Sequence, residues 1–202
     1  MFDIILADLP LFYNNRKAGG VRLQKTKFGG GAMKHYPLMK DNDLLNLKPY
    51  IDSISNKDCA LFLWVTMPKL DFCMEFMKYC GFKYKTMPFV WVKTYSKSGT
   101  IVQNPGFYTA SNAEAVILGT KGKTSRYFEP SKKMIQQVVL SPRLKHSQKP
   151  EDIQDKIDLM YPSYKKLELF ARRQKNGWTC LGNEITGNDI RIDLANLKNN
   201  IS

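Results

Sequence analysis

The chain has 202 residues, of which 43% are hydrophobic and 24% are charged. This length suits one domain, and the composition excludes general disorder. Lys and Arg total 31 against 18 Asp and Glu, a formal net charge of +13 that favours an anionic partner such as nucleic acid. The alternative is that the charge serves only solubility.

The cysteines and the apolar runs indicate where in the cell the protein is expected. Four cysteines and two histidines show no CxxC or zinc-finger spacing, so we expect no metal site, reduced thiols and a cytoplasmic location. No apolar run approaches the roughly 20 residues that cross a bilayer. The first residues lack the basic and long apolar regions of a signal peptide, so secretion and membrane insertion are not expected.

Short apolar runs alternate with helical periodicity along the chain, which predicts an α/β domain with a mostly parallel sheet flanked by helices. The predicted strands are 2–7, 60–66, 82–93 (interrupted at Pro88), 113–119, 166–171 and 178–182, and the predicted helices are 70–79 and 150–161. A sheet of this kind binds ligands at the carboxyl ends of its strands.

Several segments lack the pattern of a core. Residues 14–34 are basic and rich in glycine, which predicts a mobile loop directly after the first strand. Residues 95–109 and 120–133 also read as loops. Residues 187–202 alternate polar and apolar side chains and predict a loosely packed terminal arm.

Three segments carry residues suited to chemistry. Asp8 ends the first strand and is followed by Leu9, Pro10, Leu11 and aromatics, which could offer a carboxylate and a carbonyl to a planar amine, or form an ordinary turn.

The other two segments lie in the C-terminal half. The loop after 166–171 and the next strand bring Arg172, Gln174, Lys175 and Asn183, which could bond a ribose and a carboxylate or form a solvated hairpin. Lys149 precedes a helix start, where a carboxylate or phosphate binds well.

Taken in order, these segments resemble the adenine-N6 methyltransferase family typified by the catalytic subunit of the eukaryotic mRNA adenosine methyltransferase. The resemblance covers roughly Asp3 to Glu184. The motifs that carry it are Asp8-Leu-Pro10, Leu61-Phe-Leu-Trp-Val-Thr66, Val90-Trp-Val-Lys-Thr94, Asn112-Ala-Glu114, His146-Ser-Gln-Lys-Pro150, Glu168-Leu-Phe-Ala-Arg172 and Gly182-Asn-Glu184.

This resemblance implies a Rossmann-like fold with permuted motif order over residues 1–186, with 187–202 as a tail. It implies transfer of a methyl group from S-adenosyl-L-methionine (SAM) to the exocyclic N6 of adenine, without a metal. The implied catalytic residues are Asp8, Leu9, Pro10 and Leu11. The implied SAM-binding residues are Asp8, Lys149, Phe170, Arg172, Gln174, Lys175, Asn183 and Glu184. The residues implied at the target base and nucleic acid are Phe12, Tyr13, Asn14, Lys17, Arg22, Lys25, Lys27, Lys34, Lys93 and Glu114.

The catalytic tetrapeptide departs from the family pattern. The family has Asp-Pro-Pro-Trp or a close variant, whereas this chain has Leu9 and Leu11 in place of the first proline and the aromatic residue. Lost base stacking costs about 1–3 kcal/mol and a looser backbone about 1 kcal/mol. A weak or inactive homologue that binds SAM and nucleic acid is therefore the alternative.

The resemblance also bears on partners. A short chain leans toward a phage or bacterial enzyme that acts on DNA rather than RNA, in the host cytoplasm if phage-encoded. A homodimer or a heteromeric partner is open.

Overall fold

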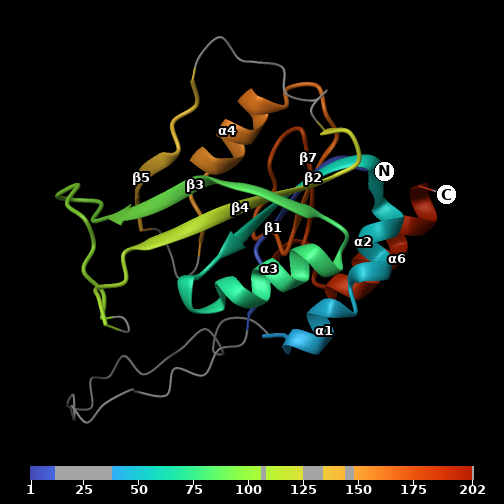
Figure 1. The fold of residues 1–202 in the computed structure, drawn as a ribbon, viewed down its shortest axis with the longest axis horizontal. Helices are drawn as coiled ribbons and strands as arrows, with labels where there is room; N and C mark the ends of the chain where they lie inside the picture. Colours follow the sequence, from blue (N-terminus) through green and yellow to red (C-terminus); the bar gives the residue numbers. More distant parts are fainter. Residues whose placement is uncertain (12–37, 106–107, 125–133, 144–147, 202) are drawn as a thin grey trace.

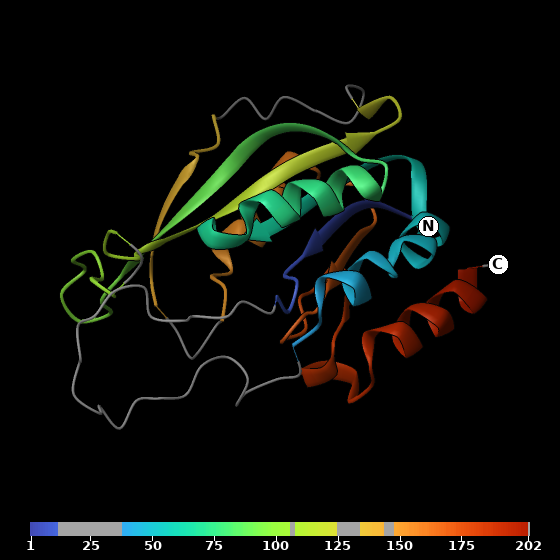
Figure 2. The same ribbon diagram turned by 60° about the horizontal axis from the view of Figure 1, so that its bottom comes forward.

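The computed structural model describes residues 1–11, 38–105, 108–124, 134–143 and 148–201. A seven-stranded sheet in the order β5-β3-β4-β2-β1-β6-β7 crosses the molecule, with helices on both faces (Figures 1 and 2). The strands are β1 (Phe2–Ala7), β2 (Ser55–Val65), β3 (Lys83–Thr94), β4 (Ala113–Lys121), β5 (Val138–Pro142), β6 (Lys166–Leu169) and β7 (Trp178–Leu181).

The sheet is mostly parallel, as expected. β1 pairs in parallel with β2 and β6, β6 with β7, and β3 with β5. β4 is antiparallel to both of its neighbours, β2 and β3. Its first residues therefore lie at the edge where the neighbouring strands end, and Glu114 is opposite Trp91 of β3.

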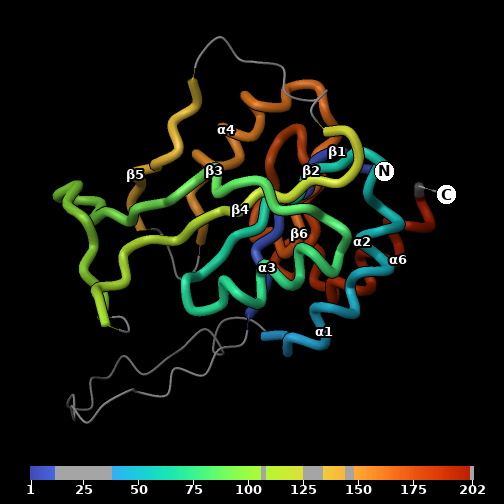
Figure 3. The backbone as a smooth tube through the Cα atoms, viewed as in Figure 1, coloured from blue at the N-terminus to red at the C-terminus, as the bar shows by residue number. Residues whose placement is uncertain are grey.

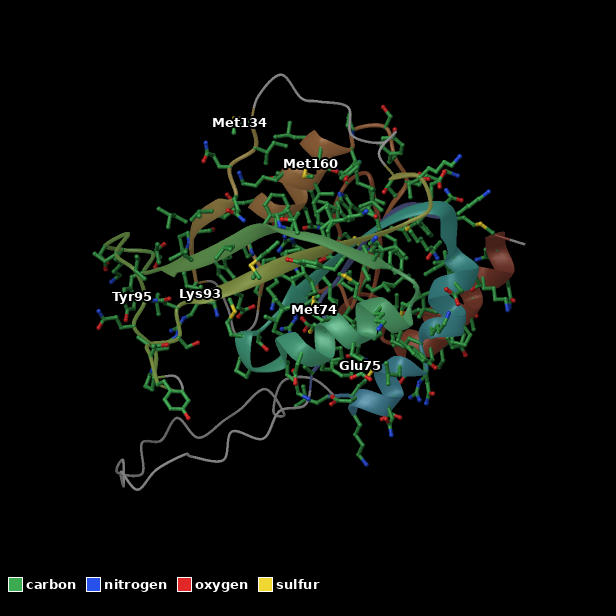
Figure 4. All side chains as sticks on the ribbon, in the orientation of Figure 1. Met74, Glu75, Lys93, Tyr95, Met134 and Met160 are labelled. Carbon is green, nitrogen blue, oxygen red and sulfur yellow. The ribbon has the colours of Figure 1, made fainter. Side chains whose placement is uncertain are left out.

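Helices cover the two faces of the sheet and divide the core in two. They are α1 (Asp41–Leu45), α2 (Lys48–Ile54), α3 (Leu70–Tyr79), α4 (Asp152–Met160), α5 (Asn183–Thr186) and α6 (Ile190–Ile201), with a 3₁₀ turn at Met67–Lys69. α4 lies on one face, and α1, α2, α3 and α6 lie on the other (Figures 1 and 2). On α3, Glu75 is exposed, whereas Met74 is half-buried and packs against the core (Figure 4).

Alternate residues of β2 supply both halves of the core, because successive side chains of a strand point to opposite faces. Leu61 and Leu63 pack with the buried residues of α2, α3 and α6. Phe62 and Trp64 pack with Ile153 and Ile157 of α4 and with β3. A strand that is buried on both faces reads as one continuous apolar run, which is why this strand was predictable.

The C-terminal segment differs from the expectation. Residues 190–201 form α6, with Ile190 and Leu194 buried against the core, so the prediction of a loosely packed arm was wrong. α6 packs along α2, and the N- and C-termini lie near each other at that side of the molecule (Figure 3). α6 was not predicted because polar residues separate its apolar ones. α2, against which it packs, was not predicted either.

The structure also adds elements at the edges. β5 is an edge strand with only alternate residues buried, and β2 begins five residues before the predicted start at residue 60. β3 continues through Pro88 with a register shift between Thr86 and Phe89, because proline cannot donate to the ladder.

The four cysteines are buried free thiols, and no helix in the described parts is long and apolar enough to cross a membrane.

Candidate active site

Asp8 is the first polar residue after the end of β1, in the middle of the carboxyl edge of the sheet. Its backbone N–H donates to the carbonyl of Leu169 at the end of β6, with an N···O distance of 3.4 Å. β1 is apolar from Ile4 to Ala7 because it is buried between β2 and β6. The strand therefore places a carboxylate at the point where the sheet opens to ligands.

Lys149 lies at the same edge because it precedes α4 and the start of α4 lies there. Gln154 of α4 bonds Glu168 in β6, and Asp158 near the end of α4 pairs with Lys166 at the start of β6. α4 thus runs opposite to β6, and the residues just before α4 lie at the carboxyl edge.

Four side chains form a continuous row of alternating charge at this edge. The Nζ of Lys149 lies 3.0 Å from Asp8 Oδ1 and 2.8 Å from Glu114 Oε2, and the Nζ of Lys93 lies 2.6 Å from Glu114 Oε1. Each of the four side chains is only 14–20% exposed, so water screens these pairs weakly. Lys93 stands near the end of β3 (Figure 4).

Two tryptophans face the ammonium groups of this row. Lys149 Nζ lies 5.2 Å from the ring centroid of Trp64, and Lys93 Nζ lies 5.0 Å from that of Trp91. The two rings pack edge-to-face at 6.2 Å between centroids. Both tryptophans are buried core residues, as expected, and they also hold the two cations by cation–π contact.

Burial and the neighbouring charges shift the pKa of three members of the row, and the balance differs between the two carboxyl groups. Burial alone raises the pKa of Glu114, but Lys149 and Lys93 outweigh burial and lower it to about 2. Burial lowers the pKa of Lys149, but Asp8 and Glu114 together raise it above its usual value. Burial raises the pKa of Asp8 even though Lys149 opposes the shift. Glu114 and Lys149 are therefore charged at neutral pH.

Two adjoining pockets open beside this row and share Asp8, Phe170 and Arg172. The first carries three basic and two acidic side chains and is lined by Leu6, Asp8, Trp64, Gln148, Lys149, Pro150, Ile153, Gln154, Glu168, Phe170, Arg172 and Arg173. The second is lined by Asp8, Pro10, Met39, Phe170, Ala171, Arg172, Asn183, Glu184, Asn188, Asp189 and Ile190.

The backbone at the ends of β6 and β7 is unusual. Phe170, which lines both pockets, has φ of 61°, a conformation that non-glycine residues rarely adopt. A Cβ on Gly182 would lie 2.3 Å from the carbonyl oxygen of Ala171, so only glycine fits there. Strained or side-chain-free backbone of this kind is concentrated at functional sites.

The structure brings most of the described candidate residues together. Asp8, Lys149, Phe170, Arg172, Asn183, Glu184 and Pro10 line the pockets, and Lys93 and Glu114 join them through Lys149. Arg172 Nη1 lies 3.4 Å from Glu184 Oε1, which links the ends of β6 and β7.

Other candidates lie elsewhere. Gln174 is exposed and lines neither pocket, and Lys175 pairs with Asp155 of α4. Leu9 and Leu11 are only 6% exposed and belong to the core. The loop 14–34 and the candidates Phe12, Tyr13, Asn14, Lys17, Arg22, Lys25, Lys27 and Lys34 lie outside the described residues.

The turn after Asp8 is closed by backbone hydrogen bonds. The N–H of Leu11 donates to the carbonyl of Leu9 at 2.8 Å, and the N–H of Met39 donates to the carbonyl of Pro10 at 2.9 Å. The carbonyl of Leu9, expected to accept from a substrate amine, therefore already accepts one bond and has one lone pair left.

Several pocket residues were not named as site residues from the sequence, among them Trp64, Gln154, Glu168 and Arg173. Burial raises the pKa of Glu168 to about 7, although Arg173 and the amide of Gln154, whose Nε2 donates at 3.0 Å, oppose the shift. A glutamate inside a buried apolar strand was the available signal, because such an acid needs partners.

Comparison with known proteins is consistent with this geometry. The MT-A70 family profile matches residues 2–184. The chain is 34% identical over 201 residues to the type II methyltransferase M.MunI of Mycoplasma sp., covering 95% of this chain and 81% of that protein.

Two eukaryotic relatives match over a smaller part. An N(6)-adenosine-methyltransferase MT-A70-like protein of Arabidopsis thaliana is 28% identical over 155 residues, which is 75% of this chain and 22% of that protein. The human N(6)-adenosine-methyltransferase catalytic subunit METTL3 is 27% identical over 133 residues, 64% of this chain and 22% of METTL3. The chain therefore spans about a fifth of these two proteins.

Proposed function

The chain belongs to the MT-A70 family of methyltransferases, and from this premise we propose that it transfers a methyl group from SAM to N6 of adenine in DNA. The observation that carries the proposal is the placement of Asp8 between two pockets that share Phe170 and Arg172 at the carboxyl edge of the sheet.

The residues of the two pockets suit the two ends of SAM. Lys149 and Arg172 supply positive charge for the carboxylate of the methionine end. Asn183, Glu184 and Asn188 in the second pocket supply amide and carboxylate groups for ribose hydroxyls and an adenine ring. When bound, SAM supplies a methyl group on a positively charged sulfur.

Asp8 is the residue proposed to act on the substrate amine. Its carboxylate accepts a hydrogen bond from the exocyclic N–H of adenine and orients the nitrogen lone pair toward the methyl group. A charge-assisted bond of this kind is worth about 1.5–3 kcal/mol, so positioning in line must supply most of the barrier lowering. Asp8 must be ionised for this role, and its neighbour Lys149 stabilises that state.

One observation supports DNA as the substrate. A relative that aligns with almost the whole chain is a type II methyltransferase of a bacterium, whereas the two eukaryotic adenosine methyltransferases share only about a fifth of their length with it. The net charge of +13 favours salt-dependent binding to the phosphates of a nucleic acid of either kind.

A weakly active or inactive binding homologue is the second candidate, because of Leu9 and Leu11. The burial of Leu11 in the core favours it, since a side chain in that position cannot stack on a flipped base.

The test is transfer of a labelled methyl group from SAM to adenine-containing single- and double-stranded DNA and to RNA. We expect transfer to DNA by the unaltered protein and none by Asp8→Ala, with the exposed Glu75→Gln as the control that keeps activity. Calorimetry of SAM binding runs alongside. Binding without transfer supports the second candidate, and neither binding nor transfer overturns both.

A further inference from the structure

The two adjacent arginines after β6 contact different parts of the fold. Arg172 pairs with Glu184 beyond β7. Arg173 crosses instead to the start of α4, where it contacts three residues. Its Nη1 donates to the backbone carbonyl of Lys149 at 3.1 Å, its Nη2 donates to Gln154 Oε1 at 2.8 Å, and its Nε lies 3.1 Å from Glu151 Oε1.

Lys149 itself has little regular structure to hold its backbone. It lies outside any helix or strand, and α4 begins only at Asp152. Pro150 follows it and has no N–H to donate. The contact from Arg173 therefore holds the main chain at the residue whose ammonium group reaches both Asp8 and Glu114.

Acidic residues at the start of α4 stabilise Arg173 there, against the unfavourable effect of the helix dipole. A cation near a helix N-terminus is disfavoured by the helix dipole. Glu151, together with Asp152 and Asp155 of the first turn, offsets this cost. Gln154 completes the arrangement, since its oxygen accepts from Arg173 while its nitrogen donates to Glu168 of β6.

We propose that Arg173 is a positioning residue that fixes the backbone of Lys149, and thereby aims the Lys149 ammonium group at Asp8 and Glu114. Arg173 lines the first pocket, but in this proposal it acts through Lys149, because its guanidinium group is occupied by contacts to the start of α4. The consequence for catalysis rests on the proposed function, because Lys149 is there the partner of Asp8 and of the SAM carboxylate.

The primary test measures the position of Lys149 without using activity. Acylation of individual lysines by an amine-reactive ester is followed by mass spectrometry in the unaltered protein, in Arg173→Ala and in Asp155→Asn. The control Asp155→Asn removes another contact between α4 and the same loop, the pair with Lys175, but leaves Lys149 untouched.

We expect Lys149 to react about tenfold faster in Arg173→Ala, as when its pKa falls by about one unit, and to be unchanged in Asp155→Asn. Millimolar guanidinium ion should restore slow labelling to Arg173→Ala. Equal increases in both variants would mean general loosening of α4, and an unchanged Lys149 in a folded Arg173→Ala would exclude positioning. Should Arg173→Ala not fold, Arg173→Lys takes its place, with a smaller increase expected because a single ammonium group keeps the charge but cannot reproduce the planar fork that contacts Lys149 and Gln154.

The kinetic arm separates this inference from the proposed function. If methyl transfer occurs, Arg173→Ala should raise KM for SAM at least tenfold while leaving KM for DNA within twofold. A fall in SAM affinity with normal Lys149 labelling would instead make Arg173 a direct ligand and overturn the inference. If the unaltered protein transfers no methyl group, the labelling result still decides whether Arg173 positions Lys149.

Discussion

Lys149 Nζ lies 3.0 Å from Asp8 Oδ1, although the two residues come from opposite halves of the chain. They meet because β1 is central in the sheet and α4 runs antiparallel to β6, so both residues end at one edge. Lys149 also pairs with Glu114, which β4 brings to this edge by running against its neighbours. A single ammonium group thus couples the candidate catalytic carboxylate to the other charges of the site.

Restoring the family tetrapeptide should lower stability at both altered positions, because both leucines are packed in the core. Leu9→Pro should lower the free energy of unfolding by about 1–3 kcal/mol, since proline fills less of the buried space than leucine. Leu11→Trp should destabilise the fold by about 1–3 kcal/mol, because Leu11 is packed in the core. Thermal melts beside methyl-transfer assays measure both effects. Unchanged stability of Leu11→Trp would contradict the burial of Leu11.

Glu114→Gln should lower the free energy of unfolding at pH 7 by about 3 kcal/mol, since it removes a carboxylate whose pKa is lowered to about 2. Because the folded pKa is below the unfolded value, the stability that Glu114 supplies is complete above about pH 4.5 and is lost as the pH falls toward 2. Urea unfolding at pH 7 and pH 3 measures the difference, which should shrink at the lower pH. The exposed Glu75→Gln should show no such pattern.

Glu168→Gln should have the opposite pH dependence. Burial raises the pKa of Glu168 to about 7, so its contribution to stability is complete below about pH 4.5 and is lost as the pH rises through 7. The variant should therefore match the unaltered protein near pH 4 and exceed it by up to about 3 kcal/mol at pH 8. Gln keeps an oxygen for the bond from Gln154. An equal effect at both pH values would mean that burial does not govern this acid.

Leu194→Ala should cost about 2–5 kcal/mol of stability, because Leu194 is fully buried between α6 and the core. The matched control is Ile192→Ala on the exposed side of the same helix, where Ile192 is 52% exposed and a change within about 0.5 kcal/mol is expected. Chemical denaturation of the two variants measures the contrast. Similar small effects in both would restore the view of residues 187–202 as a loosely attached arm.

Much of the fold was predictable because the burial of a segment is visible in its pattern of apolar residues. The run 60–66 is apolar on both faces of the sheet, so it read as a buried strand, and Pro150 with the apolar spacing after it read as a helix. α6 was missed because only a narrow stripe of it, including Ile190 and Leu194, is buried. β5 was missed because it is a short edge strand with alternate residues exposed.

By itself, the sequence determined the α/β class and the residues that end each strand, because hydrophobic periodicity reports local burial and strand ends. It therefore identified Asp8, Lys149 and Arg172 as candidates for one edge. Only the tertiary structure decided that Glu114 joins Lys149, that Leu11 turns into the core and that Lys175 pairs with Asp155. Those contacts depend on strand order, strand direction and the path of α4, and periodicity along the chain carries no information about any of the three.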